Sequence, residues 1–283
     1  LDVLKTAMLE LSQVSEMGVD PTGPKVIIDA NLLLQPDFLQ LAYQPKVSTR
    51  SGEALGVEAL VRWRHPEHGD VSPAIFVALI EQEGRTGELL DIVMSMAARD
   101  RKRYRALASM PDISINISVL DLDDEELPRR AQKILLEAAP ADRWTFEVTE
   151  TAPITDVAPA LSILTRLRIA GFKLSVDDFG TGTSNYERLL VAPFTELKID
   201  RAMVSRLDIN ADEPDPMVRS GIDVGHSLQL QVVAEGVESV DQFRMVRDLG
   251  CDAAQGYLIS PPVAPVQLDM ALDDWRRKFE YLS

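Results

Sequence analysis

Oxygen-bearing side chains recur within short apolar segments of this sequence. They are Glu58, Asn116, Glu147, Asp177, Asp178 and Glu235. Burying a carboxylate is costly unless it is paired or binds a cation. Carboxylate and amide oxygens suit Mg²⁺ or Mn²⁺ better than zinc or copper. The adjacent pair Asp177-Asp178 would let one carboxylate bridge two metal ions while the other binds the second ion, as is typical of phosphodiester hydrolysis.

The spacing of these polar residues places each set on one face of its segment. Ser114, Asn116 and Ser118 alternate with isoleucines, and Glu147 alternates with Phe146 and its apolar neighbours. Because strand side chains alternate with period two, such a set points to a single side. One polar residue near a strand end has little meaning, but the same pattern in four segments favours a site. A structural calcium ion is the alternative, although the residues are scattered over several segments rather than gathered in one loop.

The elements that must position these residues are short apolar segments separated by longer amphipathic ones. The expected strands are Leu41–Val47, Gly56–Trp63, Asp112–Ser118, Trp144–Glu150, Phe172–Asp178, Glu196–Asp200, Gln231–Glu235 and Cys251–Tyr257. Eight strands with helical crossovers predict an α/β fold, a TIM-like (β/α)8 barrel. The segment between the first two strands, residues 48–55, is too short for a helical crossover, so we expect a hairpin and one antiparallel strand. Several polar residues lie toward the carboxyl ends of the strands, where barrel active sites form.

Helix signals separate most of these strands. Ser72-Pro73 predicts a helix start, with proline at the first helical position. Gly171 follows an apolar stripe with helical spacing and predicts the end of that helix. Ser239 and Gln242 have the spacing of a capping box at the start of a further helix.

Composition excludes several classes of function. The chain has 283 residues and a formal net charge of −16, so it would repel a nucleic-acid backbone and a general nuclease is disfavoured. One cysteine and three histidines without paired spacing exclude an internal disulfide and cysteine-based zinc binding. No apolar run approaches the ~20 residues that span a bilayer. We therefore expect a cytoplasmic segment without membrane contact of its own, while attachment through an upstream region stays open.

The first residues form a segment of their own. Apolar residues from Leu1 to Leu11 have helical spacing, and Gly18 and Pro21 end the pattern. One interpretation is the first helix of the domain. The other, which we favour because the sequence begins without methionine, is a linker helix and loop over residues 1–25 that follows an upstream regulatory domain, with the main domain over residues 26–283.

Several motifs in this sequence together resemble one known family. They are Tyr43-Gln44-Pro45, Glu58-Ala59-Leu60, Asn116 within Ile115–Ser118, Glu147–Glu150, Asp177–Gly182, Leu197–Asp200, Val233–Glu238 and Gln255–Tyr257. Each motif alone is weak evidence, but their order and spacing from about residue 41 to residue 262 resemble the EAL domain. The resemblance implies an EAL-type barrel that hydrolyses cyclic di-GMP to the linear dinucleotide pGpG with two Mg²⁺ or Mn²⁺ ions, and that calcium inhibits.

The resemblance also implies roles for particular residues. By this resemblance, the first ion would be bound by Glu58, Asn116, Glu147 and Asp177. The second ion would be bound by Asp177, Asp178 and Glu235. Lys198 would hold the attacking water or stabilise developing charge, and either Lys198 or Glu235 would accept its proton. Gln255 resembles the glutamine that lies near this water.

Other positions would contact the ligand or support the site. Gln44, Leu60, Arg62 and Asp200 resemble ligand contacts, since an arginine suits a phosphate through its planar fork. Glu150 resembles the carboxylate that braces the loop after Asp178. The family has an aromatic residue and two serines after Gly182, whereas this chain has Thr183-Ser184-Asn185-Tyr186. The loop contributes to dimers in the family, so we expect a homodimer whose coupling this change affects.

Two alternatives to an active enzyme stay open. One is a catalytically inert receptor that binds cyclic di-GMP; such members lack metal ligands, whereas this chain keeps them. The other is a protein-interaction module without the ligand. Binding without turnover, or no binding at all, would distinguish these from the phosphodiesterase.

Overall fold

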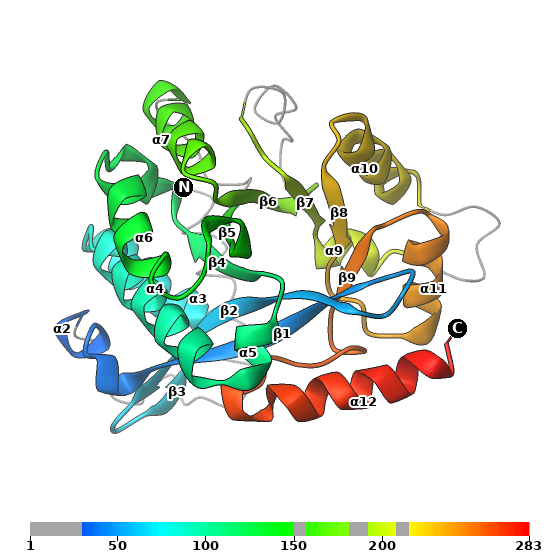
Figure 1. Cartoon of the computed structure of the whole chain (residues 1–283), viewed down its shortest axis with the longest axis horizontal. Helices are drawn as coiled ribbons and strands as arrows, with labels where there is room; N and C mark the ends of the chain where they lie inside the picture. Colours follow the sequence, from blue (N-terminus) through cyan, green and yellow to red (C-terminus); the bar gives the residue numbers. More distant parts are fainter. Residues whose placement is uncertain (1–29, 150–156, 181–191, 208–214, 283) are drawn as a thin grey trace, which may run out of the picture. The chain divides into compact units, whose positions relative to one another are not determined.

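The computed structural model describes residues 30–149, 157–180, 192–207 and 215–282 (Figure 1). The chain divides into two compact units. The first comprises Leu1–Gln40 and Val61–Leu89, and the second comprises Leu41–Leu60 and Leu90–Ser283. The predicted linker, residues 1–25, lies outside the described residues, so the boundary at residue 26 stays a prediction.

A mixed sheet contains the described strands. Among the described residues it has nine strands in the order β1-β9-β8-β7-β6-β5-β4-β2-β3, and pairing of β1 with β2 closes a barrel that leaves β3 as an extra strand. The strands are β1 Leu39–Ser48, β2 Ala54–His65, β3 Gly69–Val71, β4 Ile113–Ile117, β5 Trp144–Thr149, β6 Lys173–Phe179, β7 Glu196–Ile199, β8 Gln231–Ala234 and β9 Ala253–Gln255. The TIM-like barrel predicted from the sequence is therefore confirmed.

Strand directions follow from the lengths of the connections. Strand β2 and the strands from β4 to β9 pair in parallel around the barrel, from β2–β4 to β8–β9. Strand β1 pairs antiparallel with β9, as expected for a first strand joined to β2 by a tight turn. Strand β3, which pairs antiparallel with β2, was not predicted, because three residues are too few to show a strand period.

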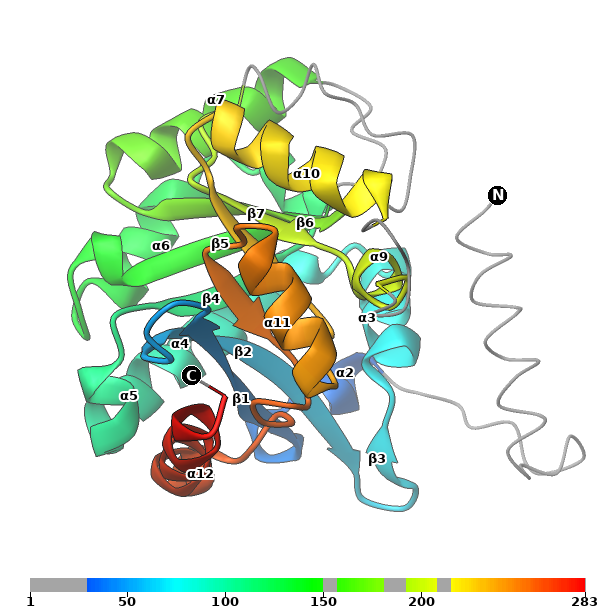
Figure 2. The same cartoon turned by 90° about the vertical axis from the view of Figure 1, so that its right-hand side faces the viewer.

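Helices separate most of the strands along the chain. The α-helices are α2 Ala30–Leu33, α3 Pro73–Gln82, α4 Thr86–Arg103, α5 Arg105–Ser109, α6 Leu127–Leu135, α7 Val157–Ile169, α9 Arg201–Val204, α10 Pro216–Ser227, α11 Val240–Asp248 and α12 Leu268–Glu280. Short 3₁₀ turns cover Pro36–Phe38, Val119–Asp123, Ala141–Arg143 and Pro265–Gln267. Figure 2 shows α10 next to β7, and α10 contacts both β7 and β8.

The predicted helix boundaries agree with the structure. Ser239 and Gln242 form the expected capping box at the start of α11. Helix α3 begins at Pro73, although the Ser72 side chain makes no capping hydrogen bond. Gly171, two residues after α7, has a φ of 96°, a left-handed conformation that favours glycine.

The first unit is described by itself. Its helices α2 and α3 contact each other, and the end of β2 pairs with β3. Trp63, which is 1% exposed, packs edge-on against Phe76 of α3 and against His65. Arg62 of this unit donates a hydrogen bond to its neighbour's carbonyl, Val61 O, at 3.0 Å.

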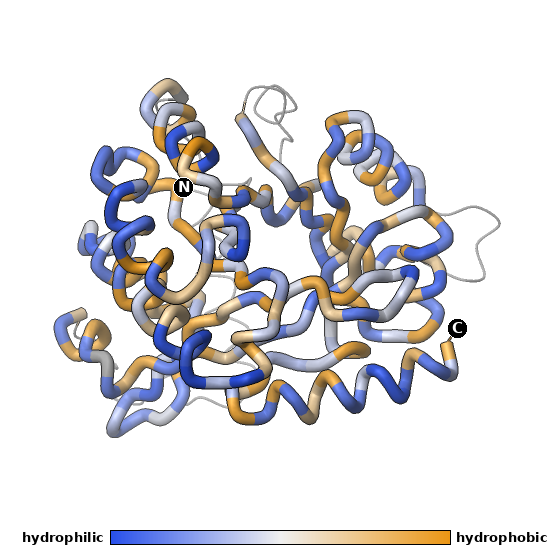
Figure 3. Tube along the Cα trace, in the orientation of Figure 1, coloured by the Kyte–Doolittle hydropathy of each residue, from blue (hydrophilic) through white to orange (hydrophobic). Residues whose placement is uncertain are grey.

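Helix α12 is held by an aromatic cluster. Hydrophilic and hydrophobic stretches alternate along it (Figure 3), as in a helix packed on one side. The ring of Trp275 lies 5.4 Å from that of Phe243 and 5.7 Å from that of Phe279, and its Nε1 donates to Gly52 O at 2.8 Å. Gly52 has a φ of 71°, and an added Cβ would lie 2.4 Å from the Phe279 ring. The β1–β2 turn therefore requires glycine there.

This cluster gives a prediction about stability. We expect Trp275→Ala to lower the free energy of unfolding by about 3–5 kcal/mol, because it leaves a cavity and removes a buried hydrogen bond. Met270→Ala on the same helix, where the side chain is 61% exposed, should change it by less than about 0.5 kcal/mol. Urea unfolding followed by far-UV circular dichroism measures both. Equal effects of the two substitutions would contradict the packing described here.

Candidate active site

The second unit gathers charged and amide side chains at the carboxyl ends of its strands. Glu58 comes from β2, Asn116 from β4, Glu147 from β5, Asp177 and Asp178 from β6, Lys198 from β7 and Gln255 from β9, while Glu235 directly follows β8. Because parallel strands end at one edge of a barrel, residues far apart in sequence meet there.

Glu58 is held on both carboxylate oxygens. Asn116 Nδ2 donates to Glu58 Oε1 at 2.7 Å, and Gln255 Nε2 donates to Glu58 Oε2 at 2.6 Å. Gln255 Nε2 also lies 3.2 Å from Gln44 Oε1, and Gln44 Nε2 donates to Ser260 O at 3.1 Å. Since both amides use their nitrogen on Glu58, the oxygens of Asn116 and Gln255 are left to act as ligands or acceptors.

Lys198 lies at the centre of the site and is 1% exposed. Its Nζ is 2.7 Å from Glu147 Oε2 and 2.7 Å from Glu235 Oε1. It is 3.2 Å from Asp177 Oδ1 and 3.6 Å from Glu58 Oε2. The sequence placed this lysine between Leu197 and Ile199 on a buried strand, and the structure explains its burial by carboxylates on several sides.

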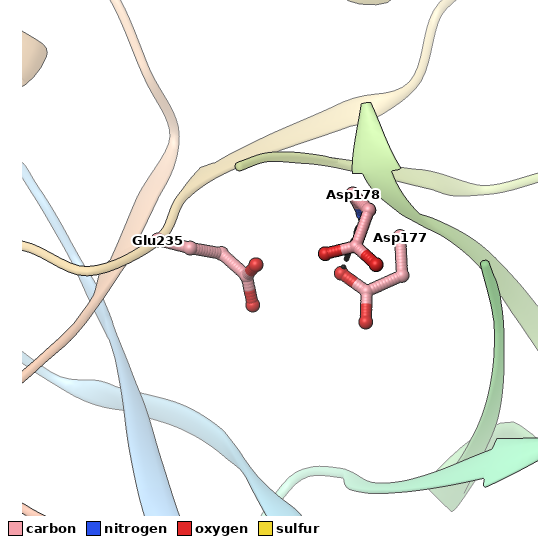
Figure 4. Close-up of side chains that lie close together, drawn as sticks. All are labelled: Asp177, Asp178 and Glu235. Carbon is pink, nitrogen blue, oxygen red and sulfur yellow. Dashed lines mark hydrogen bonds between the residues drawn. The ribbon is translucent and has the colours of Figure 1, made fainter. Parts of the chain in front are cut away.

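An irregularity in β6 brings Asp177 and Asp178 to the same site. Adjacent residues of a regular strand point to opposite faces. Here the register against β7 shifts between Val176 and Phe179, so that β6 has one residue more than its partner, as in a β-bulge. Asp178 has a φ of 57°, a left-handed conformation that is uncommon outside glycine and is concentrated at functional sites. The two carboxylates consequently face Glu235 together (Figure 4).

Asp177, Asp178 and Glu235 fit a divalent cation. Each offers one carboxylate oxygen, and these atoms lie within 4.8 Å of one another. An all-oxygen donor set of this kind matches the hard ions Mg²⁺, Mn²⁺ or Ca²⁺ rather than zinc. The acidic cluster is therefore suited to hold a metal ion.

Burial and crowding shift the pKa values of these acids. Burial, with repulsion from Glu58 and Asp177, raises the pKa of Glu147 to about 8 despite Lys198. Burial, followed by the charges of Asp177 and Asp200, raises the pKa of Asp178 to about 6. The pKa of Glu235 is also raised, first by burial. Burial opposes ionisation of Glu58 as well, but Lys198 and the two amides outweigh it and lower the Glu58 pKa. Glu147, Asp178 and Glu235 therefore favour their neutral forms more than a free carboxyl group does, whereas Glu58 favours its ionised form.

A pH dependence of the metal-free protein follows from Glu147. The folded state favours the neutral form of Glu147. The ordinary pKa of a glutamate is about 4.5, so between about pH 4.5 and about pH 8 the folded state retains a proton on Glu147 that the unfolded chain has released. Stability contributed by Glu147 should therefore fall as pH rises through this window. In EDTA, we expect Glu147→Gln to become progressively more stable than the wild type between pH 5 and pH 8 in urea unfolding. The exposed Glu125→Gln should show no such trend, and a constant difference for Glu147→Gln would contradict the assignment.

The remaining predicted residues are placed less centrally. Asp200 caps α9, because its Oδ1 accepts from Ala202 N at 2.7 Å. Leu60 ends the stretch of β2 that belongs to the second unit, whereas Arg62 belongs to the first. A shared ligand for these two stays a prediction. Glu150 and the segment Thr183-Ser184-Asn185-Tyr186 lie outside the described residues.

One buried ion pair was not predicted. Lys46 of β1, 3% exposed, lies with its Nζ 2.5 Å from Glu196 Oε2 at the start of β7. Near the amino ends of the strands, Thr145 also donates to Asp112 Oδ2 at 2.6 Å. The signal in the sequence was a lysine within a predicted strand, and this does not reveal its partner.

Comparison with known proteins agrees with the fold. The sequence matches the EAL domain family over residues 29–262. It is 36% identical over 242 residues to "Cyclic di-GMP phosphodiesterase PA2567" of Pseudomonas aeruginosa, covering 84% of this chain and 40% of that protein. It is also 36% identical over 246 residues to "Cyclic di-GMP phosphodiesterase NbdA" of the same bacterium, covering 86% of this chain and 31% of that protein.

Solved structures give the same result. "PaMucR Phosphodiesterase, c-di-GMP complex" has a TM-score of 0.77 and 34% identity, covering 85% of this chain and 98% of that chain. The EAL domain of Mycobacterium smegmatis DcpA has a TM-score of 0.68 and 29% identity, covering 87% and 98% of the two chains. This chain belongs to the EAL domain family. It spans less than half the length of the two curated relatives named above, and among its described residues no helix is both long and apolar enough to cross a membrane.

Proposed function

We propose that this chain is a metal-dependent phosphodiesterase that hydrolyses cyclic di-GMP to linear pGpG. The observation that carries the proposal is the ring of carboxylates around Lys198, with Asp177, Asp178 and Glu235 close enough to share an ion. Family membership and the printed activities of the relatives support the substrate. An inert receptor would lack some of the proposed metal ligands, whereas this chain has all of them.

The ions of this proposal are two Mg²⁺ or Mn²⁺, with calcium as an inhibitor. Glu58, Asn116, Glu147 and Asp177 would hold the first, and Asp177, Asp178 and Glu235 the second. Five carboxylates and one ammonium leave four negative charges when all are ionised, which two divalent ions would neutralise before substrate binds. Such ions would acidify the attacking water and would neutralise charge on the phosphoryl oxygens.

The protein residues then orient the reacting groups. Gln255, whose nitrogen is committed to Glu58 and Gln44, has its oxygen left to accept a hydrogen bond from the attacking water. Burial opposes protonation of Lys198, but Glu147 and Glu235 outweigh it and raise its pKa well above the ordinary value. A lysine in this state donates hydrogen bonds to developing negative charge rather than accepting a proton, which favours Glu235 as the acceptor.

Ligand contacts form a further part of the proposal. Leu60, Arg62 and Asp200 would contact the dinucleotide, with Arg62 on a phosphate. Gln44 is 8% exposed and is hydrogen-bonded to Gln255 and Ser260. A contact between Gln44 and the dinucleotide would therefore replace one of these hydrogen bonds. Gln44 also supports the position of Gln255. Glu150 would brace the loop after Asp178.

The cellular setting is also proposed. We infer a homodimer, a regulatory domain upstream of residues 1–25 and a cytoplasmic location. Relatives more than twice the length of this chain support further domains. Size-exclusion chromatography with light scattering would test the dimer.

The function is tested by incubating the purified chain with cyclic di-GMP and Mn²⁺ and separating the products by chromatography. We expect conversion to pGpG that EDTA stops and that excess Ca²⁺ suppresses. Binding measured by calorimetry without any product would instead support the inert receptor. Neither binding nor product would support the interaction module.

A further inference from the structure

Lys198 occupies the space between the acids that would bind metal ions. An ammonium has three N–H donors, and here they face Glu147 and Glu235 at 2.7 Å and Asp177 at 3.2 Å. The ammonium is 1% exposed, so these contacts replace water. Within the described part of the chain, no other lysine or arginine forms an ion pair with any of the four acids around it.

The contacts of Lys198 overlap the proposed ligand sets. Its ammonium faces the three acids assigned to the first ion, Glu58, Glu147 and Asp177, and also Glu235 of the second. Ligand oxygens lie about 2.0–2.1 Å from Mg²⁺. A cation at that distance from the same oxygens would lie close to the ammonium and repel it. Metal and ammonium therefore compete for these oxygens.

Without Lys198, the metal-free site would be a cluster of uncompensated acids. The acid side chains around it are largely buried, with 1% of Glu147, 9% of Glu58, 12% of Asp177 and 16% of Glu235 exposed. One buried cation facing four carboxylates is the kind of group whose removal leaves buried charges unpaired. The lysine consequently stabilises the same arrangement of acids that metal ions require.

We propose that Lys198 is an internal counter-cation that stabilises the arrangement of the acids when no metal ion is bound. Divalent ions must displace its ammonium to bind, so Lys198 sets the affinity of the site for metal. The inference rests on the proposed two-ion function. It gives Lys198 a positioning role before any substrate binds, in addition to its role toward the attacking water. Removing the charge while keeping an apolar side chain should make the metal-free protein less stable and the metal tighter bound.

The test compares Lys198→Met with the wild type in the full chain, stripped with EDTA and titrated with Mn²⁺ by calorimetry in the absence of nucleotide. We expect the Kd for Mn²⁺ to fall by about tenfold or more, the factor expected when a charge-assisted competitor is removed. The melting temperature in EDTA should fall, and the increase on adding Mn²⁺ should be larger than in the wild type. Lys198→Arg, which keeps a cation, should retain the wild-type Kd within about threefold.

Lys46→Met is the matched control, because Lys46 is also buried but pairs with Glu196 at 2.5 Å rather than with the site acids. It should leave the Kd within about threefold of wild type, since no proposed ligand loses a direct partner. If Lys198→Met folds only with Mn²⁺ present, that result supports the proposal. If it folds under neither condition, Lys198→Gln takes its place in the same titration.

The outcomes separate this inference from the proposed function. An unchanged or weaker Kd in Lys198→Met, with Mn²⁺ still binding the wild type, overturns the counter-cation and leaves the phosphodiesterase proposal intact. A wild-type chain that binds no Mn²⁺ overturns both. A third outcome is that Lys198→Met binds Mn²⁺ more tightly while the wild type binds Mn²⁺ but does not cleave cyclic di-GMP. That result supports the counter-cation and contradicts only the proposed function.

Discussion

Replacing Glu58 with glutamine should lower the rate of cyclic di-GMP hydrolysis by about a thousandfold or more, the loss typical when a group that organises transition-state charge is removed. Glu58 is buried, and its two oxygens accept from Asn116 at 2.7 Å and from Gln255 at 2.6 Å. Glutamine keeps the shape but loses the charge needed for the first ion. Its amide also places a second donor against Asn116 or Gln255, which disturbs the orientation of both.

The measurement is the initial rate of pGpG formation at saturating Mn²⁺, with calorimetric binding of cyclic di-GMP in Ca²⁺ as a second readout. Glu53→Gln is the matched control, because Glu53 is exposed in the turn that leads into the same strand, and its rate should stay within about twofold of wild type. A Glu58→Gln enzyme that retains a tenth of the activity would remove Glu58 from the proposed ligands.

Asp177→Asn is expected to have two opposite effects. It should abolish measurable hydrolysis, because Asp177 is the one acid assigned to both ions. It should also raise the melting temperature in EDTA by about 3 °C or more, because the Asp177 charge contributes to the raised pKa values of Glu147, Asp178 and Glu235. Asparagine keeps an oxygen for the hydrogen bond from Asp178 N, at 2.9 Å in the wild type. Active sites commonly trade stability for function in this way.

Thermal unfolding with EDTA and with Mn²⁺ tests the second effect, and the variant should also lose most of the stabilisation that Mn²⁺ gives the wild type. Asp223→Asn, at an exposed position of α10, should change neither quantity. A lower melting temperature for Asp177→Asn in EDTA would show that its ion pair with Lys198 outweighs the repulsion among the acids.

Local patterns in the sequence were sufficient for the barrel. The short apolar segments matched all the expected strands, and the signals at Ser72-Pro73, Gly171 and Ser239 matched three helix ends, since such signals depend only on neighbouring residues. The short connection between the first two strands also gave the antiparallel strand β1. The short strand β3 was missed, because its pairing with β2 rather than its own pattern defines it.

The candidate site was predictable only in part. Alternation placed Asn116 and Glu147 on one face of their strands, and the resemblance supplied the other members. The resemblance assigned both Asp177 and Asp178 to the second ion, but it did not show how adjacent residues of one strand come to face the same site, because a regular strand would separate them. Nor did it show that Gln44 is bound to Gln255 and Ser260 inside the protein. These features depend on partners far away in the sequence.

The sequence by itself determined the order of strands and helices, the acidic character and the oxygen-rich residues at the strand ends, because hydrophobic period and residue chemistry are local properties. Only the tertiary structure decided that Lys198 meets acids from four other strands or strand ends and that a bulge in β6 turns two adjacent aspartates to one side. Closing the barrel fixes the stagger between neighbouring strands, and that stagger determines which side chains meet.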